Sequence, residues 1–328
     1  MYSWADKCRG GKTVGQCCFG VDIGGTTVKI GLFDQEERPV HTWEIPTRKD
    51  DNGSHILEDI AKALEHELVI REIRPEQVLG VGLDVPGPVV DGKVIYAINL
   101  GWGYVDAAAE LSAMFHDIPV KVANDANAAA LGEAWFGSAK GYRNVVTLTL
   151  GTGLGQGIVL DGKVLEGCHG AAGEIAHAIF YPDAEADCNC GHRGCLEQIA
   201  SATGIVNKAK QLLRDTDLHS VLREKELFSA KDVMDACKAQ DPVGMQTVNT
   251  LVDYLGRAMA VIAAVLDPEA FVIGGGVSRT GNWLNELLRA RMAEAAPPAC
   301  RDIRVLPAAL GNDAGMYGSA ALILSEKK

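Results

Sequence analysis

Residues 19–34 read FGVDIGGTTVKIGLFD, in which one apolar run enters a Gly-Gly turn and a second apolar run leaves it. Two short apolar runs joined by a glycine turn predict a β-hairpin. Residues 144–167 read NVVTLTLGTGLGQGIVLDGKVLEG and repeat this design, with a strand, a glycine-rich bend, a second strand, a turn and a third strand. The two segments share a design rather than a detailed sequence, which suggests two related α/β halves that face each other.

Further strands and helices are predicted after each hairpin. Apolar residues in 54–70 recur at the spacing of one helix face, and 124–137 has a polar start, good helix formers and a final glycine. After the first hairpin we expect strands near 40–45, 78–89 and 119–123 and helices near 54–70, 106–116 and 124–137. After the second we expect helices near 203–214, 230–239, 243–266, 282–295 and 313–325, and strands near 270–278 and 303–306.

The composition limits the class of protein. The chain has 328 residues, which is enough for two domains, and a formal net charge of −12. That charge argues against nucleic acid and anionic membranes as partners, because both need a basic surface. The most apolar long stretch, Ala258–Leu266, is much shorter than the roughly 20 residues of a membrane span. The N-terminus lacks an apolar signal core, so we expect a cytoplasmic protein.

Three glycine-rich bends are candidates for binding phosphate, at 22–27, 151–155 and 274–276. Glycines let the backbone approach a ligand and point its N–H groups at oxyanions. Asp22 lies at the end of a predicted strand and is suited to hold Mg²⁺, directly or through water, while Lys29 offers positive charge. Any one bend alone is as well explained as a tight turn. Two bends in matching places of two halves favour the phosphate interpretation.

The densest group of potential metal ligands is CNCGHRGCLE at residues 188–197. A disulfide knot, a redox pair, a catalytic metal site and a structural metal clamp are the alternatives. A cytosolic chain argues against a disulfide framework, and the segment contains no C-x-x-C pair. Three thiolates and one histidine form a common zinc set that leaves no position for water, so a structural zinc is favoured over a catalytic one. The other six cysteines are scattered, and we interpret them as ordinary thiols.

The fourth ligand is either His192, inside the loop, or His177, in GEIAH at 173–177, and we favour His177. This segment is typical of a short helical turn, on which Glu174 and His177 share a face. A metal would then fix Glu174, His177 and Glu197 as a wall of polar groups suited to a polyol. The alternative is a zinc loop that only stabilises the protein surface and has no role in binding substrate.

With these motifs in hand, the chain resembles the ROK family of sugar kinases, and within it the bacterial ROK glucokinases. The resemblance runs from about Phe19 to the C-terminal helix. The combination of an early D-x-G-G-T-x-x-K with C-x-C-G-x-x-G-C-x-E is highly specific. In the order of the family, the matching motifs are DIGGTTVK, PGPV, NLGW, NDANAAALGE, GTGLGQG, GEIAH, CNCGHRGCLE and IGGGVS.

The resemblance implies an α/β fold of the actin-like, hexokinase-like (ribonuclease H-like) kind, a two-domain ATPase fold with ATP in a central cleft. We expect residues 19–123 and 312–328 to form a small α/β domain and 124–311 a large α/β domain that carries the zinc loop. Residues 1–18 are expected to be a disordered N-terminal extension. The family also implies a homodimer or a dimer of dimers.

The resemblance also assigns residues to the site. A structural Zn²⁺ would be bound by His177, Cys188, Cys190 and Cys195. The sugar would be bound by Asn99, Asn124, Asp125, Glu174, His177 and Glu197. ATP with Mg²⁺ would be bound by Asp22, Gly24, Gly25, Thr26, Thr27, Lys29, Gly151, Thr152, Gly153, Gly275 and Gly276.

Asp125 is the predicted general base. It would take the proton from the sugar 6-hydroxyl as that oxygen attacks the γ-phosphate of ATP. Asn124 and Asp125 are also good helix caps, and the dipeptide alone favours that role. Together with the glycine bends and the polar wall, the catalytic role is favoured. One residue can act both as a helix cap and in catalysis.

The predicted activity is ATP-dependent phosphorylation of a hexose, chiefly glucose to glucose 6-phosphate. The same chemistry on mannose, fructose, allose or N-acetylmannosamine is the nearest alternative. A sugar-binding ROK regulator would carry a DNA-binding module before the first hairpin, for which 18 residues are too few. A non-catalytic sugar sensor would need a damaged base or phosphate bend. One departure from the family is Ala176, where glucokinases usually have glycine, and its effect on sugar preference is left open.

Overall fold

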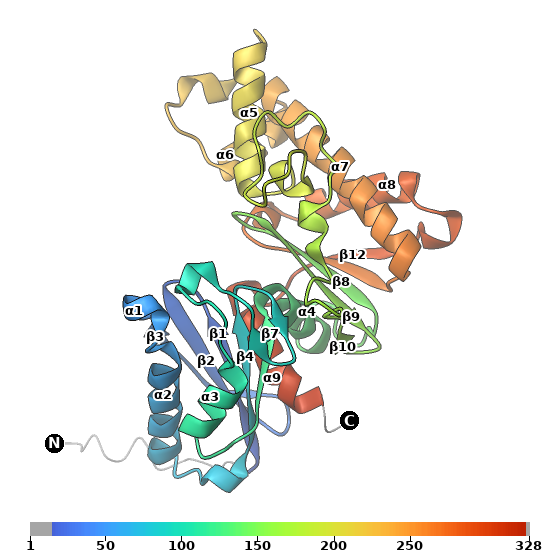
Figure 1. The fold of residues 1–328 in the computed structure, drawn as a ribbon. Coiled ribbons are helices and arrows are strands. Elements are labelled where there is room, and N and C mark those ends of the chain that lie inside the picture. Colours follow the sequence, from blue (N-terminus) through green and yellow to red (C-terminus); the bar gives the residue numbers. More distant parts are fainter. Residues whose placement is uncertain (1–14, 326–328) are drawn as a thin grey trace, which may run out of the picture. The chain divides into compact units, whose positions relative to one another are not determined.

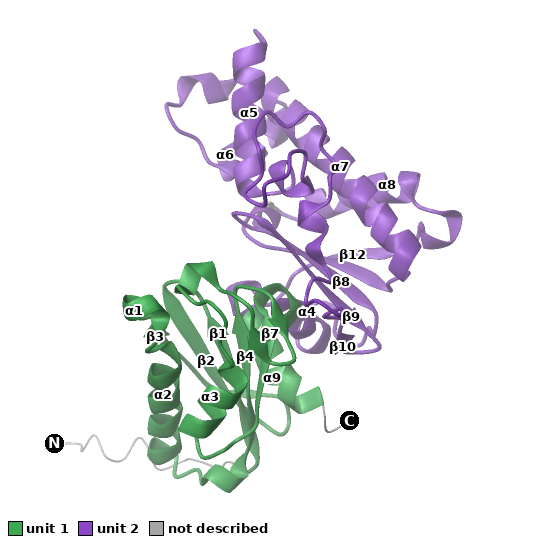
Figure 2. Cartoon of the chain, in the orientation of Figure 1, with its two compact units in different colours: residues 1–128, 315–328 green, residues 129–314 purple. Residues whose placement is uncertain are grey.

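The computed structural model describes residues 15–325, which form two compact α/β units (Figures 1 and 2). Unit 1 takes the described residues up to 128 and those from 315 onward, and unit 2 takes residues 129–314. The chain passes from one unit to the other within helix α4 (Asp125–Trp135) and near the start of helix α9 (Ala314–Leu324). The domain boundaries expected from the sequence were 123 and 312.

Unit 1 is built on a five-stranded sheet with the order β3-β2-β1-β4-β7. Strands β1, β2 and β3 are antiparallel neighbours, whereas β4 runs parallel to both β1 and β7. The hairpin predicted from FGVDIGGTTVKIGLFD is therefore confirmed as β1 and β2. The strands are β1 (Cys17–Ile23), β2 (Thr27–Asp34), β3 (Pro39–Pro46), β4 (Val78–Val85) and β7 (Val120–Asn124), with a small separate pair β5 (Val89–Val90) and β6 (Lys93–Val94).

Unit 2 has a sheet of the same topology, with the order β10-β9-β8-β11-β12. Again the first three strands are antiparallel neighbours, and the last two extend the sheet in parallel. The shared order and directions confirm that the chain contains two related halves. The strands are β8 (Val145–Leu150), β9 (Leu154–Leu160), β10 (Lys163–Val164), β11 (Ala270–Gly274) and β12 (Arg304–Pro307).

Alternating side chains of β1 face two different layers of unit 1. Phe19 and Val21 are buried in a core with helices α2 (Ile56–Ile70) and α3 (Ala107–Met114), which Figure 1 shows beside the sheet. Gly20 faces α9, where an added Cβ would lie 2.2 Å from the Met316 carbonyl oxygen. Glycines in the strands therefore let α9 pack directly on the backbone of the sheet. The short helix α1 (Asp50–Gly53) precedes α2.

Three helices of unit 2 are capped by the side chain that directly precedes them. Ser201, Ser229 and Asp241 each accept hydrogen bonds from backbone N–H groups in the first turn that follows. Most of their buried side chains are aliphatic and form one core with the sheet. The helices are α5 (Ala202–Asp215), α6 (Ala230–Lys238), α7 (Pro242–Leu266) and α8 (Trp283–Ala295).

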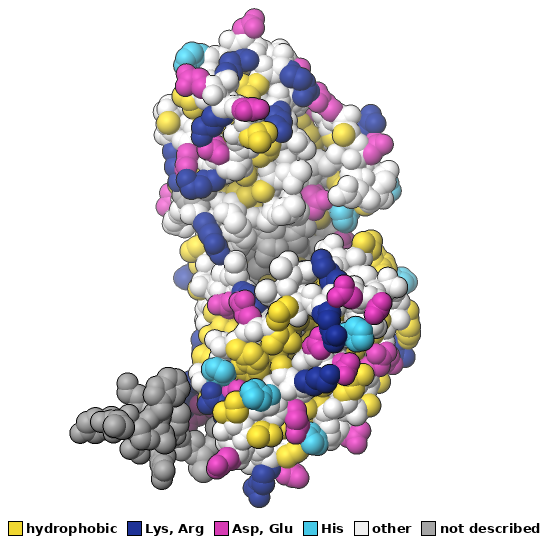
Figure 3. All heavy atoms as spheres, turned by 90° about the vertical axis from the view of Figure 1, so that its left-hand side faces the viewer, with side chains coloured by type: hydrophobic (Ala, Val, Ile, Leu, Met, Phe, Trp, Pro, Cys, Tyr) yellow, Lys and Arg dark blue, Asp and Glu magenta, His cyan; other side chains and the backbone are white. Residues whose placement is uncertain are grey.

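Among the described residues, α7 is the one helix that is long and apolar enough to cross a membrane by length and composition. Its best window has a mean hydropathy of 1.3, and 56% of that window is buried inside the structure. Such burial is typical of a core helix. On the face shown in Figure 3, acidic and basic side chains are intermixed without a continuous basic surface.

The predicted N-terminal extension is too long at its C-terminal end. Cys17 and Cys18 belong to β1 and pair with Asp34 and Phe33 of β2. Both cysteines are fully buried, because their small apolar side chains fit the core of the sheet, and burial raises the pKa of Cys17 to about 11. Residues 1–14 of the predicted extension lie outside the described residues.

Candidate functional site

Three acidic residues meet at the carboxyl edge of the parallel strands in unit 1. Asp22 lies near the end of β1, Asp84 lies near the end of β4, and Asp125 directly follows β7. These strands are neighbours in the sheet, and the register pairs Asp22 with Asp84 and Val85 with Asn124. Ligands of open α/β sheets bind at this edge. The topology therefore brings the predicted Mg²⁺ ligand and the predicted base to one place.

Asp84 was not predicted, although it is the most buried member of this group. Its side chain is fully buried; Oδ2 accepts a hydrogen bond from the Ser319 hydroxyl at 2.9 Å, and Oδ1 has no hydrogen-bond partner among the described residues 15–325. Burial, reinforced by the negative charges of Asp22 and Asp125, raises the pKa of Asp84 well above its ordinary range. A lone carboxylate in the apolar strand VLGVGLDV is the sequence signal that marks it.

A glycine in the first turn of α9 makes room for these carboxyl groups. A Cβ on Gly315 would lie 2.8 Å from Asp84 Oδ2 and 3.1 Å from Asp22 Cγ. Any larger residue would push the carboxyl groups out of place. Partial positive charge at the start of a helix also favours nearby carboxylates.

Asn124 and Asp125 together form the start of α4. The Asn124 side-chain oxygen accepts hydrogen bonds from the N–H groups of Ala126 and Asn127, at 3.0 and 3.3 Å, as a helix cap does. Its amide nitrogen donates to the Gly87 carbonyl at 3.1 Å and to Asp125 Oδ1 at 2.9 Å. The Asn124 side chain thus both caps α4 and orients the predicted base.

The Asp125 carboxylate keeps one oxygen available. Oδ1 accepts hydrogen bonds from Asn124 and from the Ala126 N–H, whereas Oδ2 makes none within the described part of the chain. Desolvation by the surrounding protein raises the pKa of Asp125 to about 6, although hydrogen bonds from Ala126 and Asn124 act in the opposite direction. A carboxylate with this pKa is suited to accept a proton near neutral pH.

The first glycine bend is a closed turn between β1 and β2. The Gly24 N–H donates to the Thr27 carbonyl at 3.0 Å, and the Thr47 hydroxyl donates to the Gly24 carbonyl at 2.7 Å. Asn99 lies beside this bend, since a Cβ on Gly25 would be 3.9 Å from its carbonyl oxygen. Lys29 pairs with Asp22 in the β1–β2 register. The structure therefore groups Asn99 with the predicted nucleotide-binding residues of unit 1.

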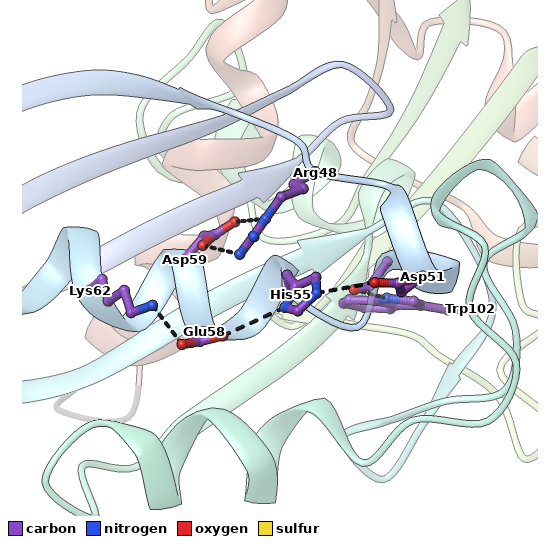
Figure 4. A network of polar contacts seen from close by, with 8 residues as sticks. Arg48, Asp51, His55, Glu58, Asp59, Lys62 and Trp102 are labelled. Carbon is purple, nitrogen blue, oxygen red and sulfur yellow. Dashed lines mark hydrogen bonds and ion pairs between the residues drawn. The ribbon is translucent and has the colours of Figure 1, made fainter.

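The loop that carries Asn99 is anchored to the segment before α2. The Trp102 indole N–H donates to the Gly53 carbonyl at 2.9 Å, and Gly53 has a positive φ of 69° that favours glycine. Figure 4 shows Trp102 beside the polar network at the start of α2, where Arg48 pairs with Asp59 at 2.8 Å. His55 lies between acidic side chains of the same network (Figure 4). The Trp102 hydrogen bond therefore ties the Asn99 loop to the segment before α2.

The second and third bends are neighbours in unit 2. The second follows β8, the third follows β11, and these adjacent parallel strands pair Thr149 with Gly274. Gly275 has a φ of 84°, and a Cβ there would lie 2.4 Å from the Leu150 carbonyl oxygen. Only glycine fits this position. The carboxyl edge of the second sheet thus carries the predicted residues Gly151, Thr152, Gly153, Gly275 and Gly276.

The predicted metal ligands come together in unit 2. The ligand atoms of His177, Cys188, Cys190 and Cys195 all lie within 4.8 Å of one another. The Cys190 and Cys195 sulfur atoms are 3.5 Å apart, much farther than the about 2.05 Å of a disulfide. Tetrahedral zinc with bonds of about 2.3 Å separates its sulfur ligands by about 3.8 Å. The spacing and the chemistry of these four groups therefore fit a closed tetrahedral metal site.

The fold of the cysteine loop decides which histidine joins the sulfur atoms. His192 is exposed, and its carbonyl accepts a hydrogen bond from the Cys188 N–H at 2.6 Å, which closes the loop. His177, in a 3₁₀ turn over Glu174–His177, points Nδ1 at the Cys188 sulfur atom at 3.7 Å. Its Nε2 lies 3.9 Å from the Glu174 carboxylate. The structure thus groups His177, rather than His192, with the cysteines.

Protonation of the cysteines reflects their surroundings. Burial, with smaller contributions from the neighbouring thiols, raises the pKa of Cys195 to about 12, so without a cation it is a neutral thiol. A hydrogen bond from the His192 N–H lowers the pKa of the exposed Cys190. A divalent metal would displace the remaining protons, so its binding would weaken as the pH falls.

The predicted polar wall has two parts. Glu174 and His177 share the 3₁₀ turn described above, whereas Glu197 lies in a second 3₁₀ turn over Leu196–Gln198. The Glu197 carboxylate accepts a hydrogen bond from the Leu154 N–H at 2.9 Å, at the end of the second glycine bend. Glu197 therefore contacts a predicted nucleotide-binding segment and also directly follows the cysteine loop.

Comparison with known protein families identifies the family of this chain. Residues 18–326 match the ROK family along nearly the whole described chain. This chain belongs to the ROK family. It is 41% identical to the glucokinase of Halalkalibacterium halodurans over 322 residues, which cover 94% of this chain and 95% of that protein.

Solved ROK structures share the fold. A ROK family glucokinase from Streptomyces griseus, in complex with glucose and AMPPNP, is 33% identical, with a TM-score of 0.72 over 93% of this chain and 98% of that one. A ROK family transcriptional regulator, a homologue of the E. coli MLC protein, is 27% identical with a TM-score of 0.81. The structural match covers 95% of this chain but 78% of the regulator. The predicted actin-like, hexokinase-like fold class is confirmed.

The departure at position 176 lies in the core of unit 2. Ala176 is only 3% exposed and packs in the same cluster as Leu196 and Tyr181. Its methyl group is therefore part of the packing beneath the 3₁₀ turn.

We expect Ala176→Gly in this ROK protein to lower stability and leave sugar preference unchanged. Loss of a buried methyl group and added backbone freedom should cost about 1–2 kcal/mol, measured by chemical denaturation. The ratio of kcat/KM for glucose and mannose should stay within about twofold, because a methyl group facing the sugar would be worth about tenfold or more. A large change in that ratio would contradict this placement.

Proposed function

We propose that this ROK protein is an ATP-dependent sugar kinase that phosphorylates glucose at its 6-hydroxyl. The observation that carries the choice of glucose is the 41% identity, across nearly the full chain, to a protein named glucokinase. The presence of glucose and AMPPNP in the related Streptomyces griseus structure supports the same substrate pair. Mannose, fructose, allose and N-acetylmannosamine stay as alternatives, because a few hydroxyl contacts decide between sugars.

In the proposed reaction Asp125 is the general base. Its Oδ2 would accept the proton of the sugar 6-hydroxyl as the oxygen attacks the γ-phosphate. Asn124 orients the carboxylate through its hydrogen bond to Oδ1. The sugar is proposed to hydrogen-bond Asn99, Asn124, Glu174, His177 and Glu197, which together offer the donors and acceptors that a hexose needs.

The glycine bends are proposed to bind ATP. The residues of the first bend with Lys29 in unit 1, and Gly151, Thr152 and Gly153 in unit 2, would contact phosphates, with Gly275 and Gly276 near the adenosine. Asp22 has the chemistry to hold Mg²⁺, directly or through water. When bound, Mg²⁺ neutralises charge on the transferred phosphoryl group.

The cluster of His177 and three cysteines is proposed to hold one structural Zn²⁺. Such a metal stabilises the fold of its loop and has no open position for substrate. His177 would bind through Nδ1, which leaves Nε2 directed towards Glu174, another proposed sugar ligand. The metal therefore contributes by orienting these side chains.

The remaining assignments rest on the sequence. We propose a cytoplasmic enzyme whose partners include neither nucleic acid nor a membrane, and its net charge of −12 supports the absence of both partners. A homodimer or a dimer of dimers is proposed from the family. A sugar-responsive regulator is the second candidate function, favoured by the TM-score of 0.81 to the regulator.

A coupled assay of ADP release tests the proposal. Purified protein would be supplied with ATP, Mg²⁺ and, separately, glucose, mannose, fructose, allose and N-acetylmannosamine. We expect kcat/KM to be highest for glucose. A clear preference for another sugar would keep the mechanism and change the substrate, whereas sugar binding without turnover on any sugar would favour the regulator.

The pH dependence tests the base. We expect kcat/KM for glucose to fall as the pH drops through about 6 and to be constant above it, because Asp125 must be unprotonated to accept a proton. Its side chain is exposed, so water screens part of the shift and the inflection should lie at or somewhat below 6. If kcat/KM instead falls only at about pH 4, Asp125 is not desolvated during the reaction.

A further inference from the structure

The Glu197 carboxylate lies directly against the second glycine bend. Its Oε2 accepts the hydrogen bond from the Leu154 N–H at 2.9 Å, and a Cβ on Gly153 would lie only 2.4 Å from the same oxygen. The absence of a side chain at Gly153 is therefore what lets the carboxylate reach the backbone of the bend.

The segment that follows Glu197 supports the rest of the bend. The Ala202 N–H donates to the Gly151 carbonyl at 2.8 Å, and the Thr203 hydroxyl donates to the Thr152 carbonyl at 2.9 Å. The Ser201 hydroxyl, which caps α5, donates back to the Glu197 carbonyl at 2.8 Å. One short segment thus holds the bend at several successive residues.

The segment before Glu197 is fixed to the metal loop. Cys195 is fully buried, and the Gln198 side-chain oxygen accepts from the N–H groups of Gly194 and Cys195 at 2.8 and 3.1 Å. The Gln198 amide donates to the Ala186 carbonyl at 2.7 Å. Glu197 is therefore held between the cysteine loop on one side and the glycine bend on the other.

The two oxygens of the Glu197 carboxylate are in different situations. Oε2 is engaged by the bend, whereas Oε1 has no hydrogen-bond partner within residues 15–325. The side chain is half-buried, so part of it is accessible to a ligand. A single carboxylate can thus contact the bend and accept a sugar hydroxyl at once.

We propose that Glu197 couples the sugar and nucleotide sites: Oε2 holds the second glycine bend in its phosphate-binding form, and Oε1 binds the sugar. This inference rests on the proposed kinase function and gives Glu197 the role of a positioning residue for the nucleotide. Sugar bound to Oε1 fixes the carboxylate and so stabilises the bend. By linkage, sugar and nucleotide then increase each other's affinity by the same factor.

Calorimetric titration of the full chain with AMP-PNP and Mg²⁺, without sugar, tests the positioning role. We expect Glu197→Ala to raise the Kd of AMP-PNP about tenfold, because the charged hydrogen bond to the bend is lost. Glu197→Gln keeps an oxygen acceptor for the Leu154 N–H, so its Kd should stay within about threefold of wild type. A residue that only binds sugar would leave nucleotide affinity unchanged in both variants.

Glu174→Ala is the matched control. It removes another predicted sugar ligand of unit 2 that makes no hydrogen bond to the bend. We expect this variant to bind glucose more weakly and AMP-PNP as wild type does. If Glu197→Ala also binds AMP-PNP as wild type does, or binds it more tightly through relief of charge repulsion, the positioning role is wrong.

Gly153→Ala tests the coupling while leaving the carboxylate in place. The added methyl group meets the end of the flexible Glu197 side chain, which can turn away, so the fold should survive. Melting curves and metal content would confirm this. We expect glucose to lower the Kd of AMP-PNP several-fold in wild type and to have no such effect in Gly153→Ala.

The result separates this inference from the proposed function. A wild-type protein that binds no AMP-PNP would contradict the kinase assignment and the coupling with it. A wild-type protein that binds AMP-PNP and phosphorylates glucose, with glucose changing the Kd equally in wild type and Gly153→Ala, would overturn the coupling alone.

Discussion

Replacing Asp125 by asparagine is expected to lower kcat for glucose phosphorylation by about 10³-fold, within the range that general-base catalysis contributes. The Kd for glucose should change by no more than about threefold, because the lost interaction is made in the transition state. Asparagine is a good helix-start residue, so α4 should be retained. Steady-state kinetics and glucose titration measure both quantities.

Asp106→Asn is the matched control for this variant. Asp106 is also an acidic residue at a helix start of unit 1, where it accepts a hydrogen bond from the Ala109 N–H at 3.2 Å. Its substitution removes the same charge from a helix N-terminus outside the candidate site, and activity should stay within about twofold of wild type. Near-normal turnover in Asp125→Asn would remove Asp125 from the role of base.

Loss of the metal is expected to have the second large effect. We expect Cys190→Ser to reduce bound zinc from one atom per chain to nearly none and to weaken glucose binding about 10- to 100-fold. Cys190 is exposed, so the substitution itself should disturb packing little. The free energy of metal binding also stabilises the folded state, so the melting temperature should fall. Elemental analysis, calorimetry and thermal melting measure the three effects.

Cys168→Ser is the control, since Cys168 is an exposed cysteine outside the cluster of metal ligands. It should keep its metal, its melting temperature and its glucose affinity. A Cys190→Ser protein that lacks zinc but binds glucose normally would show that the cluster only stabilises its loop and does not shape the sugar site. That outcome would leave the proposed kinase activity standing.

Much of the fold could be predicted because its signals are local. The apolar runs around the Gly-Gly turn near Gly24 gave β1 and β2, and helix caps such as Ser201 and Asp241 lie where the helices begin. The start of β1 was misjudged, because Cys17 and Cys18 carry no strand signal until Asp34 and Phe33 pair with them. Pairing partners decide such ends more than the residues themselves do.

The cluster of His177 and three cysteines could be predicted in part. The close spacing of three cysteines within eight residues is enough to predict that they share one site. His177 and His192 were both available as the fourth ligand, and the path of the chain between them decided the choice. The contact between Glu197 and the Leu154 N–H had no signal in the sequence, because 43 residues separate the two.

The sequence by itself determined the two hairpins, the glycine bends, the cysteine loop and the cap at the start of α4, because each is encoded within a few neighbouring residues. The tertiary structure alone decided that Asp84 joins Asp22 and Asp125, and that Glu197 reaches the bend at Gly153. The first juxtaposition depends on which strands become neighbours in the sheet of unit 1, and the second on how the segment after the cysteine loop packs against the hairpin of β8 and β9. Both are set by burial over a whole unit, and no short stretch of sequence carries them.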